Sequence, residues 1–154
     1  TKFDGSKAAF EPIKASNNNT VSIIDSSDGQ IAAVILISEF DFRLGLMQEH
    51  FNENYLESNV YPKSTFEGLI KNFSLEELNQ DFKEHEIEGV LTIKGVNNNI
   101  TTKAKIRKID EKIELSSGFS VMLSDYKVKI PKIVFKKIDE EVKINLNFVY
   151  ERKQ

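Results

Sequence analysis

The sequence predicts an all-β fold, an antiparallel barrel of eight strands with one short helix near one end. Apolar and polar residues alternate with a period of two over most of the chain, as they do in strands that bury one face. Turn-forming residues separate these segments at intervals of about 10 to 15 residues, which favours an antiparallel barrel or sandwich over parallel βαβ units. Only one segment clearly places its apolar residues at helical steps.

Length and composition indicate one domain spanning residues 1–154. A chain of 154 residues, 40% of them hydrophobic and 29% charged, can bury one core but would divide poorly into two. A net charge of −3 argues against nucleic acid as a partner, because nucleic-acid-binding domains carry a basic excess. The absence of cysteine excludes disulfides and thiol chemistry. The longest apolar run, Ile31 to Ile37, is too short for a transmembrane helix of roughly 20 residues.

The first strands are predicted from turn residues. An opening strand is expected near Ser6 to Lys14, followed by a turn at Asn17-Asn18-Asn19, since asparagine tolerates left-handed backbone. Val21 to Asp25 and Ile31 to Ser38 are then expected to pair. The loop between them, Ser26 to Gly29, ends in the Asp-Gly pair typical of tight hairpins.

One amphipathic helix is predicted over about 44–56. Its apolar stripe consists of Leu44, Met47, Phe51 and Tyr55. The helix must stop before Tyr61-Pro62, because the residue before proline avoids helical geometry. We expect this helix to close one end of the barrel.

The second half of the chain predicts five more strands. They begin at Ser64 and then follow the alternating segments Ile87–Lys94, Ile100–Ile109, Lys112–Met122 and Val142–Tyr150. Ser74 to Glu77 resembles a capping box that would start a short helix. The charged stretch Lys83 to Glu86 is expected to be a loop.

Small residues on the expected inner faces leave two interpretations open. Gly68, Gly89, Ala104 and Ser117 alternate there with large apolar residues. An eight-stranded barrel is just wide enough either to be filled by side chains or to hold one small ligand. The small residues favour a cavity, but glycine also lets strongly coiled strands bend.

No catalytic motif is present, so neither enzymatic activity nor a cofactor is expected. His50 with Glu49, Glu53 and Glu57 could supply metal ligands at helical spacing, although a hydrogen-bonding role at the barrel mouth is the commoner use of such a histidine. The basic stretch Lys127 to Lys137 could attract an anionic lipid headgroup, or it could simply protect an exposed strand edge.

Five segments in order along the chain carry a family resemblance. They are SEFDF at 38–42, LMQEHFNENYLES at 46–58, YPKSTFEG at 61–68, GVLTIKGV at 89–96 and SDYKVKIPKIV at 124–134. In these segments the chain resembles the YceI-like family, the bacterial lipocalin-like polyisoprenoid-binding proteins. The resemblance implies an eight-stranded lipocalin-like β-barrel, a helix near one end, and an apolar channel for a long isoprenoid or fatty chain. It also implies a periplasmic or secreted protein, with a removed signal segment before Thr1.

The predicted function is binding, carriage or sequestration of an isoprenoid or other long-chain lipid. The residues expected to line the channel are Phe40, Phe42, Met47, Phe51, Tyr55, Phe66, Leu91, Ile93, Phe119 and Phe148. Tyr55, Tyr61 and His50 are expected to meet a polar head at the mouth. Two alternatives are an enzyme acting on an isoprenoid-like substrate through His50 and Glu53, and a filled barrel acting through its surface. A homodimer is compatible with the sequence, although no feature requires one.

Overall fold

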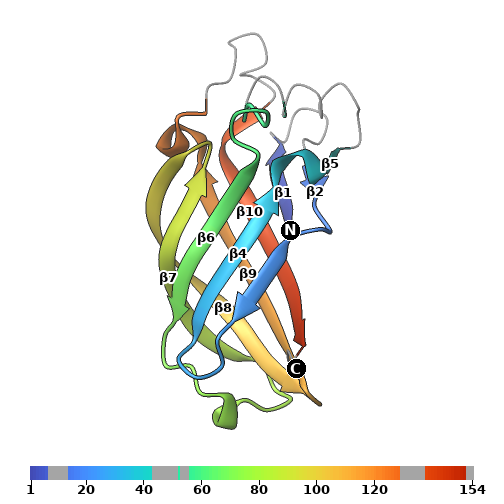
Figure 1. Ribbon diagram of the computed structural model, residues 1–154, viewed down its shortest axis with the longest axis vertical. Coiled ribbons are helices and arrows are strands. Elements are labelled where there is room, and N and C mark those ends of the chain that lie inside the picture. The colour runs from blue at the N-terminus through green and yellow to red at the C-terminus, as the bar shows by residue number, and fades with distance from the viewer. Residues whose placement is uncertain (7–13, 43–51, 53–55, 129–137, 152–154) are drawn as a thin grey trace.

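The regular structure is one strongly curled antiparallel sheet (Figure 1), seen in a computed structural model that describes residues 1–6, 14–42, 52, 56–128 and 138–151. Its strands are β1 (Lys2–Ser6), β2 (Lys14–Ser16), β3 (Val21–Ile24), β4 (Gln30–Leu36), β5 (Asp41–Phe42), β6 (Lys63–Ile70), β7 (Lys83–Ile93), β8 (Val96–Ile109), β9 (Lys112–Met122) and β10 (Ile138–Glu151). Short 3-10 turns are η1 (Ile37–Glu39), η3 (Leu75–Glu77) and η4 (Leu123–Tyr126). The strand order is β3-β4-β6-β7-β8-β9-β10-β1-β2-β5. None of the helices in these ranges has the length and apolar composition needed to cross a bilayer.

The predicted all-β antiparallel class is confirmed, but the predicted strand number is wrong. The described residues form ten strands, not eight. Residues 17–20 separate β2 from β3, and residues 37–40 separate β4 from β5, yet β3 pairs with β4 and β2 pairs with β5. The two additional strands therefore arise where two long strands are interrupted. Most of the opening strand predicted over 6–14 lies outside the described residues, as does nearly all of the predicted helix over 44–56.

Several strand bounds and turns in the second half differ from prediction, and β10 begins at Ile138 instead of Val142. The expected loop Lys83 to Glu86 is the start of β7, where Lys83 pairs with Ile106. The turn before β8 is tighter than predicted and consists of Lys94 and Gly95, both with positive φ. The predicted capping box is also wrong, because η3 is a single 3-10 turn and the Ser74 side chain does not cap it.

Asn17 fastens the interruption between β2 and β3 to the end of β4. Its side chain is fully buried, and its amide Nδ2 donates to the backbone oxygen of Leu36 at 3.0 Å. Its Oδ1 accepts from the backbone N–H of Asn19 at 2.9 Å. Its backbone N–H donates to the oxygen of Thr1 at 2.7 Å. The asparagine triplet thus supplies one buried anchor as well as a turn.

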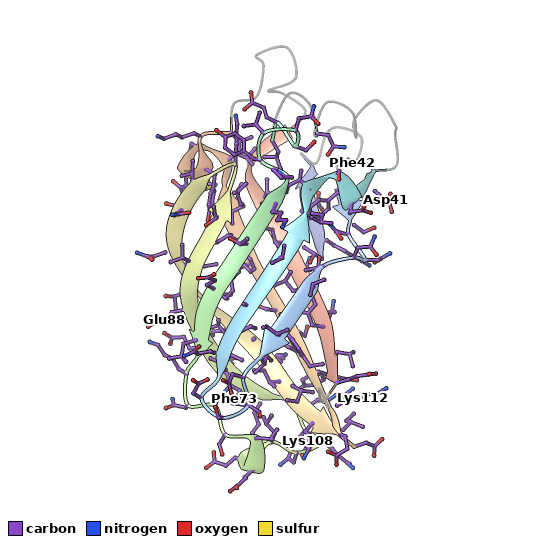
Figure 2. The ribbon with its side chains drawn as sticks, viewed as in Figure 1. Asp41, Phe42, Phe73, Glu88, Lys108 and Lys112 are labelled. Carbon is purple, nitrogen blue, oxygen red and sulfur yellow. The ribbon has the colours of Figure 1, made fainter. Side chains whose placement is uncertain are left out.

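Two clusters of buried side chains fill the interior at different levels. The upper cluster, near the end where β4 stops and β6 begins, includes Ile37, Phe40, Leu91 and Tyr126. The lower cluster includes Ile31, Ile70, Ile87, Leu78, Ala104, Ile106 and Leu115. Figure 2 shows Phe42 at the upper end and Phe73 at the lower end, with Glu88 and Lys112 on the outside. The sheet therefore buries one face along its whole length.

The end strand β3 returns toward β10 across a seam. Among the described strands, β3 has a backbone ladder with β4 alone, and β10 beyond Asn145 has one with β9 alone. A hydrogen bond of 2.7 Å between Ser22 Oγ and the Tyr150 hydroxyl joins the two strands. Burial raises the pKa of Tyr150 to about 12, although the hydrogen bond with Ser22 acts in the opposite direction.

Replacing Asn17 by alanine should lower the free energy of unfolding by about 1–3 kcal/mol, because it removes both hydrogen bonds of a fully buried side chain, including the one to the backbone oxygen of Leu36. Urea unfolding measures the change. The control is Asn18→Ala at the adjacent exposed position, where a change within about 0.5 kcal/mol is expected. Equal effects of the two substitutions would show that Asn17 is not an anchor.

The Tyr150 hydroxyl should make stability sensitive to alkaline pH. Because its pKa is higher in the folded protein than its ordinary value of 10.0, the stability it contributes is complete below pH 10.0 and is lost as the pH rises toward about 12. Urea unfolding across this range should show a steeper loss for the wild type than for Tyr150→Phe. Identical slopes would contradict the burial of this hydroxyl.

Candidate ligand-binding cavity

An elongated cavity of about 170 Å³ lies inside the curled sheet and is partly open. It is lined by Thr1, Phe3, Ile31, Ala33, Ile35, Ile37, Phe40, Phe42, Leu56, Ser64, Phe66, Ile87, Leu91, Ile93, Ile100, Thr102, Leu115, Ser117, Phe119, Val121, Leu123, Tyr126, Val128, Val142, Ile144, Leu146 and Phe148. On β7 the lining extends from Ile87 to Ile93, which at about 3.3 Å per residue corresponds to roughly 20 Å. Such a space is long and narrow.

The wall of the cavity is almost entirely apolar. Among the described residues, the lining side chains include no carboxylate, imidazole, lysine or arginine. The α-amino group of Thr1 donates to the backbone oxygen of Asn17 at 2.9 Å, and burial lowers its pKa. Apolar cavities of this kind exclude water, since water requires two or more polar partners. The wall suits hydrocarbon, and its described side chains include no carboxylate or imidazole that could act as a general acid or base.

The lower end of the cavity is closed by packed side chains. Ile70, Leu78, Ala104 and Ile106 belong to the lower cluster and are buried, but they are not part of the cavity wall. Other members of that cluster, such as Ile31 and Leu115, do line the cavity. The lower cluster therefore forms a floor beneath the cavity.

The paired glycines Gly68 and Gly89 do not leave an empty space. They lie opposite each other on β6 and β7, and a Cβ on either would come within 2.7–2.8 Å of Cζ of Phe66. The ring of Phe66 thus occupies the place of the missing side chains. Neither an empty cavity nor strand bending is sufficient to explain these two glycines, because they make room for an aromatic ring of the wall.

Seven of the twelve predicted ligand-binding residues lie on the cavity wall: Phe40, Phe42, Phe66, Leu91, Ile93, Phe119 and Phe148. Met47, His50, Phe51 and Tyr55 lie outside the described residues. Tyr61 is not part of the wall, and its ring lies against Gly95 instead. For these five residues, a role in ligand binding stays a prediction.

Several wall residues were not among the predicted ones. Phe3 was missed because no strand was predicted before residue 6, and Tyr126 because the 3-10 turn η4 has no recognisable period. Ile144 and Leu146 could have been found, since both lie on the inward face of the alternating strand β10. The alternation identified the inner face but not which part of it borders a cavity.

Two buried hydroxyls in the wall residues lack hydrogen-bond partners. Neither Ser64 Oγ nor the Tyr126 hydroxyl makes a hydrogen bond with the described residues. The Asn98 amide lies beside Tyr126, but its Nδ2 donates to the backbone oxygen of Asp125 at 2.6 Å. Burial raises the pKa of Tyr126, an effect that Asn98 opposes. By contrast, Ser117 Oγ donates to the backbone oxygen of Lys103 at 2.8 Å.

No group of three or more metal-ligating side chains occurs within the ranges that the structure describes. Of the four residues in the alternative metal site, only Glu57 falls in those ranges. Its carboxylate lies 3.7 Å from Nζ of Lys94.

A family model for the YceI-like domain matches residues 2–150. The chain belongs to the YceI-like family. This YceI-like chain has no match among curated protein sequences. The family resemblance predicted from five sequence segments is thereby confirmed.

Solved structures share the fold of this YceI-like chain. A polyisoprenoid binding domain from Saccharophagus degradans, described as implicated in plant cell wall breakdown, is 15% identical with a TM-score of 0.87, covering 99% of this chain and 92% of that one. BcnA of Burkholderia cenocepacia is 17% identical with a TM-score of 0.79, covering 97% and 94%. The YceI protein of Campylobacter jejuni is 16% identical with a TM-score of 0.72, covering 94% and 88%. At these identities the similarity establishes the fold alone.

Ser64→Ala should raise the free energy of unfolding by about 1 kcal/mol, because it removes a buried hydroxyl that has no hydrogen-bond partner in the part of the chain that the structure describes. Ser117→Ala is the matched control on the same wall, and it should lower that free energy by about 1 kcal/mol because it removes a hydrogen bond. Urea unfolding of ligand-free protein tests both. A loss of stability in both variants would mean that Ser64 has a partner.

Proposed function

We propose that this chain binds a long apolar lipid, an isoprenoid or a fatty chain, inside the cavity and carries or sequesters it. The observation that supports this most directly is the wall itself, which is apolar from Ile93 down to the floor below Ile87. In this proposal the curled sheet acts as a lipocalin-like barrel, with the Ser22 to Tyr150 hydrogen bond across its seam.

The dimensions of the cavity agree with a hydrocarbon chain. The wall follows β7 for roughly 20 Å of strand, which at a strand tilt of about 35–45° amounts to about 15 Å along the barrel axis. This is comparable with the depth of one bilayer leaflet, about 15 Å, so the chain of a membrane lipid can be enclosed along most of its length. The narrowness of the cavity favours one chain lying along the barrel. Because the described wall residues include no charged side chain, a charged headgroup is expected to remain at the upper end, outside the enclosed part.

Burial of such a chain provides enough free energy for binding. On the order of 400 Å² of apolar surface at about 25 cal/mol/Å² amounts to roughly 10 kcal/mol before costs. Association and ordering of the chain oppose this by several kcal/mol, which leaves affinity in the micromolar range. An apolar wall also distinguishes chemically similar chains only weakly, by about 1 kcal/mol per methylene.

Binding without catalysis is the form of this function that the wall supports. Proton transfer requires a titratable group within reach of the reacting atoms. The only titratable side chain on the described wall is that of Tyr126, whose pKa is raised by burial. The related structure from Saccharophagus degradans is described as a polyisoprenoid binding domain, which agrees with an isoprenoid as the ligand.

Phe119→Trp should reduce the lipid that purifies with the protein by severalfold, because the larger ring fills part of the cavity. The measurement is mass spectrometry of an organic extract of natively purified protein. The wild type is expected to yield a long-chain lipid near one per protein.

The matched control is Ser120→Trp, which makes a large substitution at the next residue of β9. Ser120 is exposed on the opposite face of the strand, so this variant should retain the lipid of the wild type. Recovery of no lipid from fresh wild-type protein, together with no binding of added lipid, would contradict the proposal. Equal loss in both variants would contradict the assignment of the cavity as the site.

A further inference from the structure

Phe66 joins the two levels of the interior. Among the aromatic rings of the described residues, only that of Phe66 packs against both the upper and the lower cluster. Phe3, Phe42 and Phe119 pack against the upper cluster alone, whereas Phe148 packs against the lower cluster. Phe66 also lines the cavity, so its ring stands on the wall where the upper part of the cavity meets the lower part.

The ring rests on bare backbone. Cζ of Phe66 lies 2.7 Å from the position that a Cβ on Gly68 would occupy and 2.8 Å from that on Gly89. Neither glycine has a side chain that could fill the space if the ring were removed. Ile31 pairs with Gly68, and Ile100 pairs with Gly89, and both of these isoleucines line the cavity at this level. Loss of the ring would therefore open a recess bounded by glycine backbone.

That recess would lie at the deep end of the cavity. Ile87 and Leu115 line the cavity and belong to the lower cluster, and the floor of Ile70 and Ile106 lies beyond them. Room gained at Phe66 thus extends the depth available to a chain that enters from the upper end. Room gained at Phe119, which belongs with the upper cluster, would widen the cavity without deepening it.

We propose that Phe66 sets the length of chain that the cavity encloses, so that it determines chain-length specificity. The inference rests on the proposed lipid-binding function. A chain can enter the space that the ring occupies only by displacing the ring from the glycine pair, where it fits closely. Chain segments beyond that point remain outside the wall and add little to affinity.

The experiment measures how affinity depends on chain length. Geraniol, farnesol, geranylgeraniol and longer all-trans prenols compete with a fluorescent apolar dye for delipidated protein. For the wild type, affinity should rise with each isoprene unit and then level off. In Phe66→Ala, the chain length at which affinity stops rising should increase by at least one isoprene unit. Affinity should rise by up to about fourfold for each methylene that becomes newly enclosed.

Phe66→Leu is the second variant. It keeps apolar packing, so it should increase the chain length at which affinity stops rising by less than Phe66→Ala does. Phe119→Ala is the matched control, a wall phenylalanine whose loss should lower affinity for all prenols by a similar factor without moving the levelling. Urea midpoints confirm that each variant is folded. If both Phe66 variants still bind all prenols and their affinity stops rising at the same chain length as in the wild type, the role of Phe66 is overturned and lipid binding is left intact. Absence of displacement in every protein, the wild type included, would overturn lipid binding and this inference with it.

Discussion

The close approach of β6 and β7 at Gly68 and Gly89 is the contact on which the interior depends. A Cβ on Gly89 would lie 2.3 Å from the backbone oxygen of Glu67 and 2.6 Å from Cα of Gly68, so no side chain is compatible with this pairing. The same absence of side chains makes room for the ring of Phe66, which connects the upper and lower clusters. One pair of glycines thus lets the strands approach and positions an aromatic ring of the wall toward the deep end of the cavity.

The cavity follows from how the two clusters are packed. The lower cluster closes the bottom of the cavity with side chains such as Ile106, which has no exposed surface, whereas the upper cluster surrounds open space with the rings of Phe40, Phe42 and Phe119. An apolar space of this kind has few favourable contacts of its own, since its lining side chains lack packing partners on one side. An apolar ligand would supply those contacts. The hydroxyls of Ser64 and Tyr126, which have no hydrogen-bond partner among the described residues, are polar groups of this wall that those residues leave unsatisfied.

Much of the fold could be predicted because strand alternation is a local property. The bounds of β9 are those predicted, and the inner faces of β6 to β10 are the ones that alternation indicates. Predictions failed where the chain departs from a regular period. The interruptions at 17–20 and 37–40 raised the strand number to ten. The charged stretch Lys83 to Glu86 forms the first, largely exposed part of β7, where it pairs with β8. A charged sequence says that a segment is solvated, not that it is a loop.

The sequence by itself determined the all-β class, the apolar inner faces and membership of the YceI-like family, because these depend on residue spacing along one strand or on the order of short segments. Only the tertiary structure decided which inner residues border a cavity, since that depends on side chains from distant strands meeting at one level. It also decided the role of Gly68 and Gly89, which lie on consecutive strands and together make room for the ring of Phe66 once β6 and β7 pair. Alternation determines which way a side chain points, whereas packing across the sheet determines what it meets there.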